Sequence, residues 1–183
     1  ILKINHYIIN MATEILNTIM SFYLPKNEIR AKEIQLCLQK NMACPNIKTI
    51  HLFLDTDECL DFLKSNYISA LKSGKIKIVK IGKQPQYSEF FNYANSLSGE
   101  LCLIMNSDIW LHSISDLSIL ENMENKLYGI TRHESDMLGH LIERYDQGSG
   151  FIGSQDAFIF RSPVKNSVIE KLSFPQNVWG SDN

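Results

Sequence analysis

An acidic side chain follows directly on an apolar run of strand length. The run covers 101–105, and Asn106, Ser107 and Asp108 come immediately after it. A carboxylate at the end of a buried strand suits a divalent cation on the phosphates of a nucleotide, because Mg²⁺ and Mn²⁺ take one or two protein carboxylates and complete their shell with phosphate oxygens or water. The same three residues would also form a turn and helix cap after a strand, so spacing alone leaves both interpretations open.

Strand-like and helix-like segments alternate along the chain, which is the pattern of βαβ units. Strands are predicted over 19–24, 49–54, 75–81, 101–105, 127–131 and 158–160. Helices are predicted over 27–40, 60–71 and 90–97, and after Ser162-Pro163, where a cap residue precedes proline. The isoleucines of 75–81 alternate with lysines, which is typical of an edge strand, whereas 101–105 is apolar throughout, as expected of a central parallel strand covered on both faces.

These elements predict an α/β fold with a mostly parallel sheet, formed by one domain over 1–183. The sequence begins at Ile1 and stops at a motif, so we expect a longer parent chain at one or both ends. In an open α/β sheet, ligands collect beyond the carboxyl ends of the strands. We therefore expect Asp108 to lie in that crevice, with Asn106 on the same side.

The order of motifs resembles the glycosyltransferases of the GT-A fold, which use nucleotide-sugar donors. The segment 103–109 is similar to the central strand and D-x-D motif of that family, and 87–95 to the helix before this strand. The segment 153–161 resembles a later strand beside the donor sugar, and 180–183 the glycine-acid-Asp motif that carries the catalytic base in inverting members. The resemblance implies a GT-A-like three-layer α/β/α sandwich. It also implies sugar transfer from a nucleotide-diphosphate sugar to a hydroxyl of a glycan, protein or lipid acceptor.

The resemblance also implies roles for individual residues. Asp108 would hold Mn²⁺ or Mg²⁺ on the donor diphosphate, and Asp182, or as second choice Asp156, would accept the proton of the acceptor hydroxyl. Contacts to the nucleotide are implied for Tyr23, Pro25, Arg30, Asp55, Tyr87, Asn106 and Arg132.

Each of these roles has a structural alternative. Asp182 could be a solvated loop acid, and Asp156 a strand-entry residue bonded to backbone. Arg30 could be a charge on a helix surface, and Tyr87 could be a core residue or helix staple.

The chain departs from the family pattern at two motif positions. Asn106 replaces the first Asp of D-x-D, which in the family tends to contact the ribose of the donor; an amide can still make that hydrogen bond. The loss of one negative charge weakens metal binding, so nucleotide binding is expected more strongly than metal dependence. Ser181 replaces the usual acidic neighbour of the base, which leaves Asp182 as the carboxylate of that motif.

Two other patterns are set aside. The segment 148–153 matches G-x-G-x-x-G, but it neither follows a strand nor opens a helix, so a hinge is the better interpretation. His133, Glu134, His140 and Glu143 lack the H-E-x-x-H spacing of a zinc site. In a GT-A setting, the polar stretch 132–150 would be a lid or acceptor loop.

Composition narrows the class of protein. The chain has 183 residues, of which 44% are hydrophobic and 21% charged, and its net charge of −2 offers no broad basic surface for nucleic acid. The apolar start, 1–20, is interrupted by polar residues, so no membrane span is expected. Cys37, Cys59 and Cys102 sit among apolar neighbours and no C-x-x-C pair occurs, which favours buried thiols and a reducing, cytoplasmic compartment.

Other function classes stay open beside the transferase. A degenerate member of the fold could bind a nucleotide or glycan without catalysis. A nucleotidyltransferase of related topology would be expected to carry a glycine-rich loop after the first strand, and this sequence has none there. A plain structural α/β domain would have no crevice beside Asp108.

Overall fold

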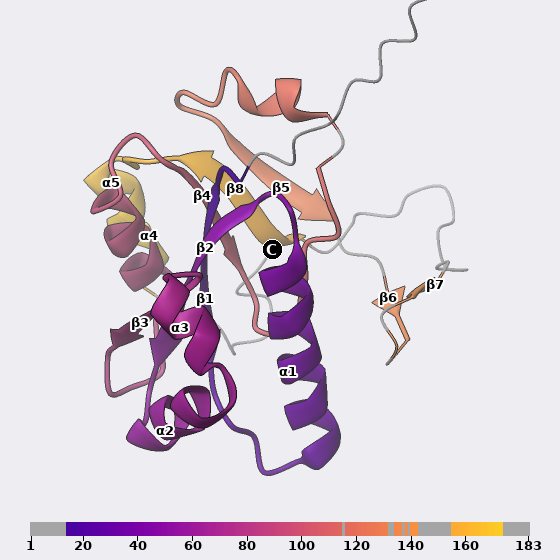
Figure 1. Cartoon of the computed structure of the whole chain (residues 1–183). Helices are drawn as coiled ribbons and strands as arrows, with labels where there is room; N and C mark the ends of the chain where they lie inside the picture. The colour runs from indigo at the N-terminus through magenta and orange to yellow at the C-terminus, as the bar shows by residue number, and fades with distance from the viewer. Residues whose placement is uncertain are drawn as a thin grey trace, which may run out of the picture.

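The computed structural model describes residues 14–114, 116–131, 134–136, 138, 140–142 and 155–173 (Figure 1). Its main sheet contains β1 (Leu16–Phe22), β2 (Ile47–Leu54), β3 (Ile76–Lys80), β4 (Leu101–Met105), β5 (Leu127–Thr131) and β8 (Gln155–Arg161). The α-helices are α1 (Glu28–Ala43), α2 (Asp57–Asn66), α3 (Ile68–Ser73), α4 (Tyr87–Asn95) and α5 (Asn166–Ile169). A separate two-stranded sheet pairs β6 (Glu134–Ser135) with β7 (Leu141–Ile142). Each of the six predicted strands overlaps a strand of the main sheet.

The strands of the main sheet follow the order β3-β2-β1-β4-β8-β5. The pairs β1–β2, β2–β3 and β1–β4 are parallel, whereas β8 runs antiparallel to both β4 and β5. The predicted edge position of the 75–81 segment is confirmed by β3. The predicted central strand is β4, all of whose residues are buried, but it is parallel to its neighbour on one side only.

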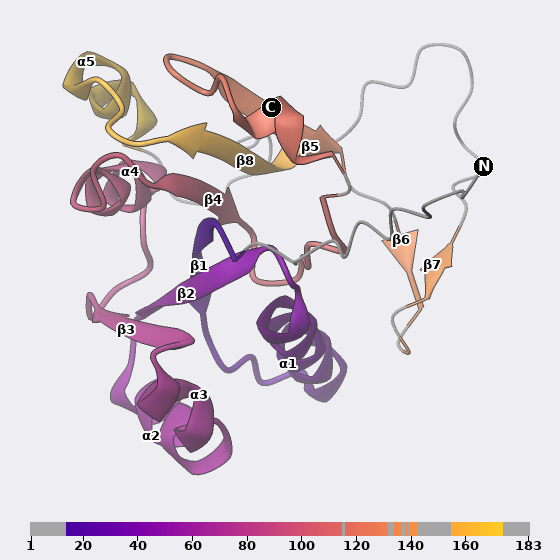
Figure 2. The same cartoon turned by 45° about the horizontal axis from the view of Figure 1, so that its top comes forward.

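Helices cover both faces of this sheet, because each central strand alternates its apolar side chains between two cores. Figure 2 shows α1 on one side and α4 with α5 on the other. On β4, Leu101, Leu103 and Met105 face the core formed with α1 and α2, and Cys102 and Ile104 face the core formed with α4 and α5. The predicted three-layer α/β/α sandwich with a mostly parallel sheet is confirmed.

Two predicted helices differ from the structure. The helix predicted over 60–71 is divided into α2 and α3 at Tyr67, whose backbone leaves the helical region. The helix predicted to open at Ser162-Pro163 begins instead at Asn166. Ser162 does not cap it: its hydroxyl donates to the carbonyl of Leu97 at 2.5 Å, which ties the end of β8 to the turn before β4.

The four cysteines are buried and unpaired, as predicted for Cys37, Cys59 and Cys102. Burial raises the pKa of the Cys37 and Cys102 thiols to about 12, so both are neutral in the fold. Within the described part of the chain, no helix combines the length and apolar character needed to cross a bilayer.

A buried polar network crosses the sheet at His51 on β2. The ring is 1% exposed, with Nδ1 2.8 Å from the hydroxyl of Tyr93 and Nε2 3.2 Å from Oδ1 of Asn17. Asn17 in turn donates to Glu100 at 3.1 Å, so its oxygen is the atom left to accept from the ring. The neutral imidazole satisfies both contacts, one nitrogen donating and the other accepting. Burial, followed by the charge of Lys77, lowers the pKa of His51 to about 4.

This lowered pKa predicts an acid-sensitive fold. The unfolded chain protonates His51 near pH 6.5, and the folded chain does so only near pH 4, so the stabilisation is complete above pH 6.5 and is lost as the pH falls toward 4. We expect the free energy of unfolding, measured by urea titration, to fall by up to about 2 kcal/mol between pH 7 and pH 5 because of this ring. His51→Gln should flatten that slope. The matched change at exposed His112 should not, and equal slopes in all three proteins would contradict the assignment.

Candidate functional site

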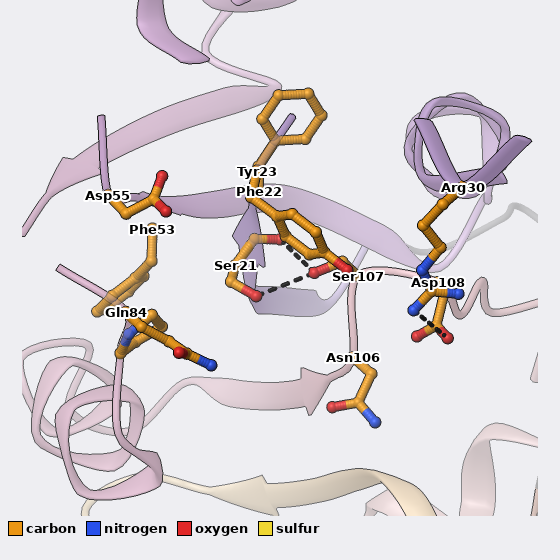
Figure 3. A pocket seen from close by; sticks show the side chains of 11 residues that line it. Ser21, Phe22, Tyr23, Arg30, Phe53, Asp55, Gln84, Asn106, Ser107 and Asp108 are labelled. Atoms are coloured by element: carbon orange, nitrogen blue, oxygen red, sulfur yellow. Dashed lines mark hydrogen bonds and ion pairs between the residues drawn. The ribbon is translucent and has the colours of Figure 1, made fainter. Parts of the chain in front are cut away.

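A pocket of about 440 Å³ opens at the carboxyl ends of three neighbouring strands (Figure 3). Its walls come from the ends of β1 and β2, the turn after β4, the first turn of α1 and the segment before α4. The lining residues are Ser21, Phe22, Tyr23, Arg30, Phe53, Asp55, Gln84, Pro85, Asn106, Ser107 and Asp108. The volume lies within the range of small-molecule sites.

The topology explains why the pocket forms here. The chain leaves β1 through α1 toward β2 on one side, and it returns through α4 to β4 on the other side of β1. The two connections therefore diverge at the carboxyl ends of β1 and β4, because α1 and α4 cover opposite faces of the sheet. Such a switch point leaves a crevice that no side chain of the core fills.

The turn that carries Asp108 is joined to β1 by a serine pair. The hydroxyl of Ser107 donates to the carbonyl of Ser21 at 3.0 Å, and the two hydroxyl oxygens lie 2.9 Å apart. Because the hydroxyl proton of Ser107 is donated to the carbonyl of Ser21, the Ser21 hydroxyl is the donor in the bond between the two hydroxyls. Toward β8, the main-chain N–H of Asn106 donates to the main-chain carbonyl of Asp156 at 3.3 Å. The turn is thus bonded to the strands on both sides of β4.

The chain beyond Asp108 is held by two buried asparagines, Asn41 on α1 and Asn46 between α1 and β2. The side chain of Asn41 donates to the carbonyl of Ile109 and accepts from the amide of Leu111, each at 2.9 Å. It thus bonds to the main chain of this segment as a neighbouring strand would. Asn46 accepts from the amide of Ile114 at 2.8 Å. Asp108 therefore sits between two anchored segments.

Arg30 reaches the same place from the first turn of α1. The cap residue Asn27 fixes the start of this helix, because its side chain accepts from the amides of Ile29 and Arg30 at 2.9 and 3.1 Å. The guanidinium donates through Nη2 to Oδ2 of Asp108 at 2.9 Å and through Nη1 to Oε2 of Glu33 at 2.6 Å. The side chains of Arg30 and Asp108 are 37% and 28% exposed, so the pair stands at the lip of the pocket.

The electrostatics of this group keep Arg30 charged. Its partial burial alone would lower the pKa of the guanidinium, but hydrogen bonds to Glu33 and Tyr23, together with the charge of Asp108 and a hydrogen bond to it, raise the pKa above the usual value. Across the pocket, Asp55 follows the end of β2, and Figure 3 shows it at the opposite side from the Arg30–Asp108 pair. The pocket thus has the Arg30–Asp108 ion pair on one side and the carboxylate of Asp55, which accepts from the thiol of Cys59 at 3.6 Å, on the other, with the ring of Tyr23 between them.

The structure brings five of the predicted site residues together in this pocket. They are Tyr23, Arg30, Asp55, Asn106 and Asp108. Pro25 is not among the lining residues. Tyr87 is 4% exposed and its ring packs against Phe90 in the core with α4, which is the structural alternative considered above.

Of the two predicted catalytic residues, only Asp156 belongs to the described part of the chain. Asp156 is 3% exposed at the start of β8. Asp182 and Arg132 lie outside the described residues, as do 148–153 and most of the predicted lid.

Sequence reasoning missed several residues of the site. Phe22, Phe53, Gln84 and Pro85 line the pocket but carry no motif. Glu33 holds Arg30 from one helical turn away, and its i,i+3 spacing was a readable signal. Ser107 and Asn41 act through partners far away in sequence, which no local pattern reveals.

The described residues do not form a closed metal centre. Among them, no group of three or more His, Cys, Asp or Glu side chains is placed to hold an ion. Asp108 offers a single carboxylate, which suits a cation whose remaining ligands are phosphate oxygens and water. That carboxylate is paired with Arg30, so the metal role of Asp108 stays a prediction. Of the zinc pattern set aside above, His140 bonds to Asp136 at 2.8 Å on the surface.

Comparisons with known proteins give only remote likenesses. No protein-family model and no curated protein matches the chain. One similar solved structure is a mannosyltransferase from Pyrobaculum calidifontis in complex with GDP-Man and Mn²⁺, which is 14% identical over 91% of this chain, with a TM-score of 0.48. This chain spans about half, 49%, of that protein. Another is 4-diphosphocytidyl-2C-methyl-D-erythritol synthase from Anaerococcus prevotii, 12% identical over 86% of this chain and 76% of that one, with a TM-score of 0.45.

Proposed function

We propose that this chain is a glycosyltransferase domain of the GT-A type, which transfers a sugar from a nucleotide-diphosphate sugar to an acceptor hydroxyl. The observation that carries the proposal is the gathering of Tyr23, Arg30, Asp55, Asn106 and Asp108 around one pocket at the switch point of the sheet. Each of those residues is predicted as a site residue from its own stretch of sequence. They come from four separate segments, so their meeting does not follow from local sequence.

The charges of the pocket support a donor lying across it. The fork of Arg30 suits a diphosphate, because guanidinium nitrogens pair with phosphate oxygens in a planar, charge-assisted geometry. Asp55, on the opposite side, can accept hydrogen bonds from the base or ribose, and Tyr23 between them offers a ring for stacking. We assign the diphosphate to the Arg30 side and the nucleoside to the Asp55 side.

A divalent cation on Asp108 fits this arrangement as a site completed by the donor. Mn²⁺ or Mg²⁺ bound there would offset the negative charge that grows on the nucleoside diphosphate as it leaves. Asn106 supplies an uncharged amide in place of a second carboxylate. The protein itself contributes the anchored turn, the serine pair and the guanidinium, which hold the diphosphate end of the pocket before the donor arrives.

Asp182 is the residue that we propose as the general base. Asp156 is the second candidate, but its side chain is 3% exposed at the start of β8, and an acceptor hydroxyl would reach it only after a rearrangement. Asp182 lies outside the described residues and is proposed on the sequence motif alone. The acceptor is unspecified, because acceptor loops vary among proteins of one fold.

A thermal-shift screen tests the donor site. UDP, GDP and their sugars should raise the melting temperature in the presence of Mn²⁺, by about 5–10 °C at a concentration of ~100 times Kd, because ligand binding adds roughly 2.7 kcal/mol to the folded state. Asp108→Asn should reduce the metal-dependent part of that shift. The matched change Asp61→Asn, at an exposed acid on α2, should leave it unchanged.

Two outcomes would change the proposal. If neither UDP nor GDP shifts the melting curve with or without metal, the donor-site assignment is wrong. Binding without donor hydrolysis or sugar transfer over a broad panel of acceptors would favour the catalytically degenerate binding module.

A further inference from the structure

The pair between Arg30 and Asp108 places a guanidinium on the carboxylate that would receive the cation. Nη2 of Arg30 lies 2.9 Å from Oδ2 of Asp108, and Glu33 holds the other terminal nitrogen at 2.6 Å. The guanidinium of Arg30 therefore already satisfies the negative charge of Asp108. A metal ion that binds Asp108 alone must displace this guanidinium or lie next to its positive charge.

The net charge of the group opposes a diphosphate approaching alone, whereas a cation is opposed only by the guanidinium on Asp108. Arg30, Glu33 and Asp108 together carry a net charge of −1. A sugar nucleotide brings two further negative charges to them, whereas a sugar nucleotide with a divalent cation brings none. Joint entry leaves the local charge unchanged, and either component alone does not.

The Arg30–Asp108 pair can exchange partners at a small cost in free energy. Both side chains are about one third exposed, and ion pairs of such exposure contribute little to stability. A guanidinium has five N–H groups, and the two carboxylates take one each through Nη1 and Nη2, so Arg30 keeps donors for phosphate oxygens. On partner exchange, the guanidinium of Arg30 would pair with phosphate oxygens and the carboxylate of Asp108 would be free to hold the cation.

We propose that the Arg30–Asp108 pair is an electrostatic latch that makes the binding of divalent cation and nucleotide diphosphate interdependent. The proposal rests on the proposed function, and it adds that Arg30 suppresses cation binding in the donor-free protein. Arg30 is then both a ligand of the diphosphate and a competitor of the metal for Asp108.

The test is the affinity for Mn²⁺ alone, measured from the paramagnetic resonance signal of free Mn²⁺ during titration. Arg30→Gln should bind Mn²⁺ roughly 5-fold more tightly than wild type, since the competing cation is gone. The same variant should bind UDP or GDP with Mn²⁺ roughly 10-fold more weakly, since a charge-assisted bond to phosphate is lost. Arg30→Lys, which keeps the charge, should stay close to wild type in its affinity for Mn²⁺ alone.

Two controls identify the carboxylate involved. In the double variant Arg30→Gln, Asp108→Asn, the gain in Mn²⁺ affinity should disappear, because the latch acts through Asp108. Arg161→Gln, at a surface arginine bonded to the carbonyl of Gly99, should change neither affinity. Far-ultraviolet circular dichroism of each variant checks that α1 is intact.

The outcomes separate the latch from the proposed function. Unchanged or weaker Mn²⁺ binding in Arg30→Gln, with nucleotide binding present in wild type, overturns the latch and leaves the transferase proposal standing. Tighter Mn²⁺ binding in the variant, without nucleotide binding in any protein, would support the ion competition and overturn the transferase proposal. If neither effect is seen, both are wrong.

Discussion

Replacing Asp182 with asparagine is expected to reduce sugar transfer about 10²–10⁴-fold while leaving the affinity for the nucleotide unchanged. The amide cannot accept the proton of the acceptor hydroxyl, so the chemical step loses its general base. The amide is close in size to the carboxylate, and the proposed donor contacts are assigned to other residues, so the Kd for UDP or GDP with Mn²⁺ should be the same in both proteins. The measurement is the rate of donor turnover at saturating donor, beside the Kd from calorimetry.

Asp156→Asn is the comparison that distinguishes the two candidate bases. Asp156 is buried at the start of β8, so a changed side chain there meets packed surroundings, and we expect this variant chiefly to lose stability. Asp61→Asn serves again as the surface control. A fully active Asp182→Asn with a turnover loss confined to Asp156→Asn would transfer the role to Asp156. Full activity in both would contradict the proposed base chemistry.

Replacing Asn41 with alanine is expected to lower the free energy of unfolding by roughly 2–4 kcal/mol. Its side chain is 0% exposed and makes two hydrogen bonds, to the carbonyl of Ile109 and the amide of Leu111, both of which lose their partner in the variant. Urea denaturation measures the change. The matched variant Asn66→Ala removes a bond to the carbonyl of Phe62 on the surface of α2 and should cost less than about 0.5 kcal/mol.

The Asn41→Ala variant should also disturb the pocket. The segment that Asn41 holds follows Asp108 directly, so its release should weaken binding of UDP or GDP with Mn²⁺ under conditions where the variant is still folded. A loss of less than about 1 kcal/mol with unchanged nucleotide affinity would contradict the view that Asn41 positions the turn.

Much of the fold could be predicted because the spacing of apolar residues in the sequence matches the faces that each strand buries. The run at β4 has no polar residue, and both faces of that strand are buried. The alternation at β3 likewise matches an edge strand. The antiparallel direction of β8 could not be predicted, because direction depends on how the chain returns to the sheet. Ser162 carried a helix-cap signal, but its hydroxyl donates to the carbonyl of Leu97 instead of accepting from helix amides.

The members of the site were easier to predict than their contacts. Asp108 and Arg30 could each be predicted from the local sequence. Their hydrogen bond could not, because it joins positions 78 residues apart. Tyr87 carried an ambiguous signal, since an aromatic residue at the start of an amphipathic helix also suits a core, and the fold buries it. Asn41 directly follows the predicted helix over 27–40, and nothing in the sequence indicates that its side-chain amide bonds to the segment after Asp108.

A crystal structure of the protein with UDP or GDP and Mn²⁺ tests the central claim most directly. The account predicts the diphosphate against Arg30, the nucleoside toward Asp55 and Tyr23, and the cation on the carboxylate of Asp108. A nucleotide bound elsewhere on the protein, with the Arg30–Asp108 pair unbroken and the pocket empty, would contradict it.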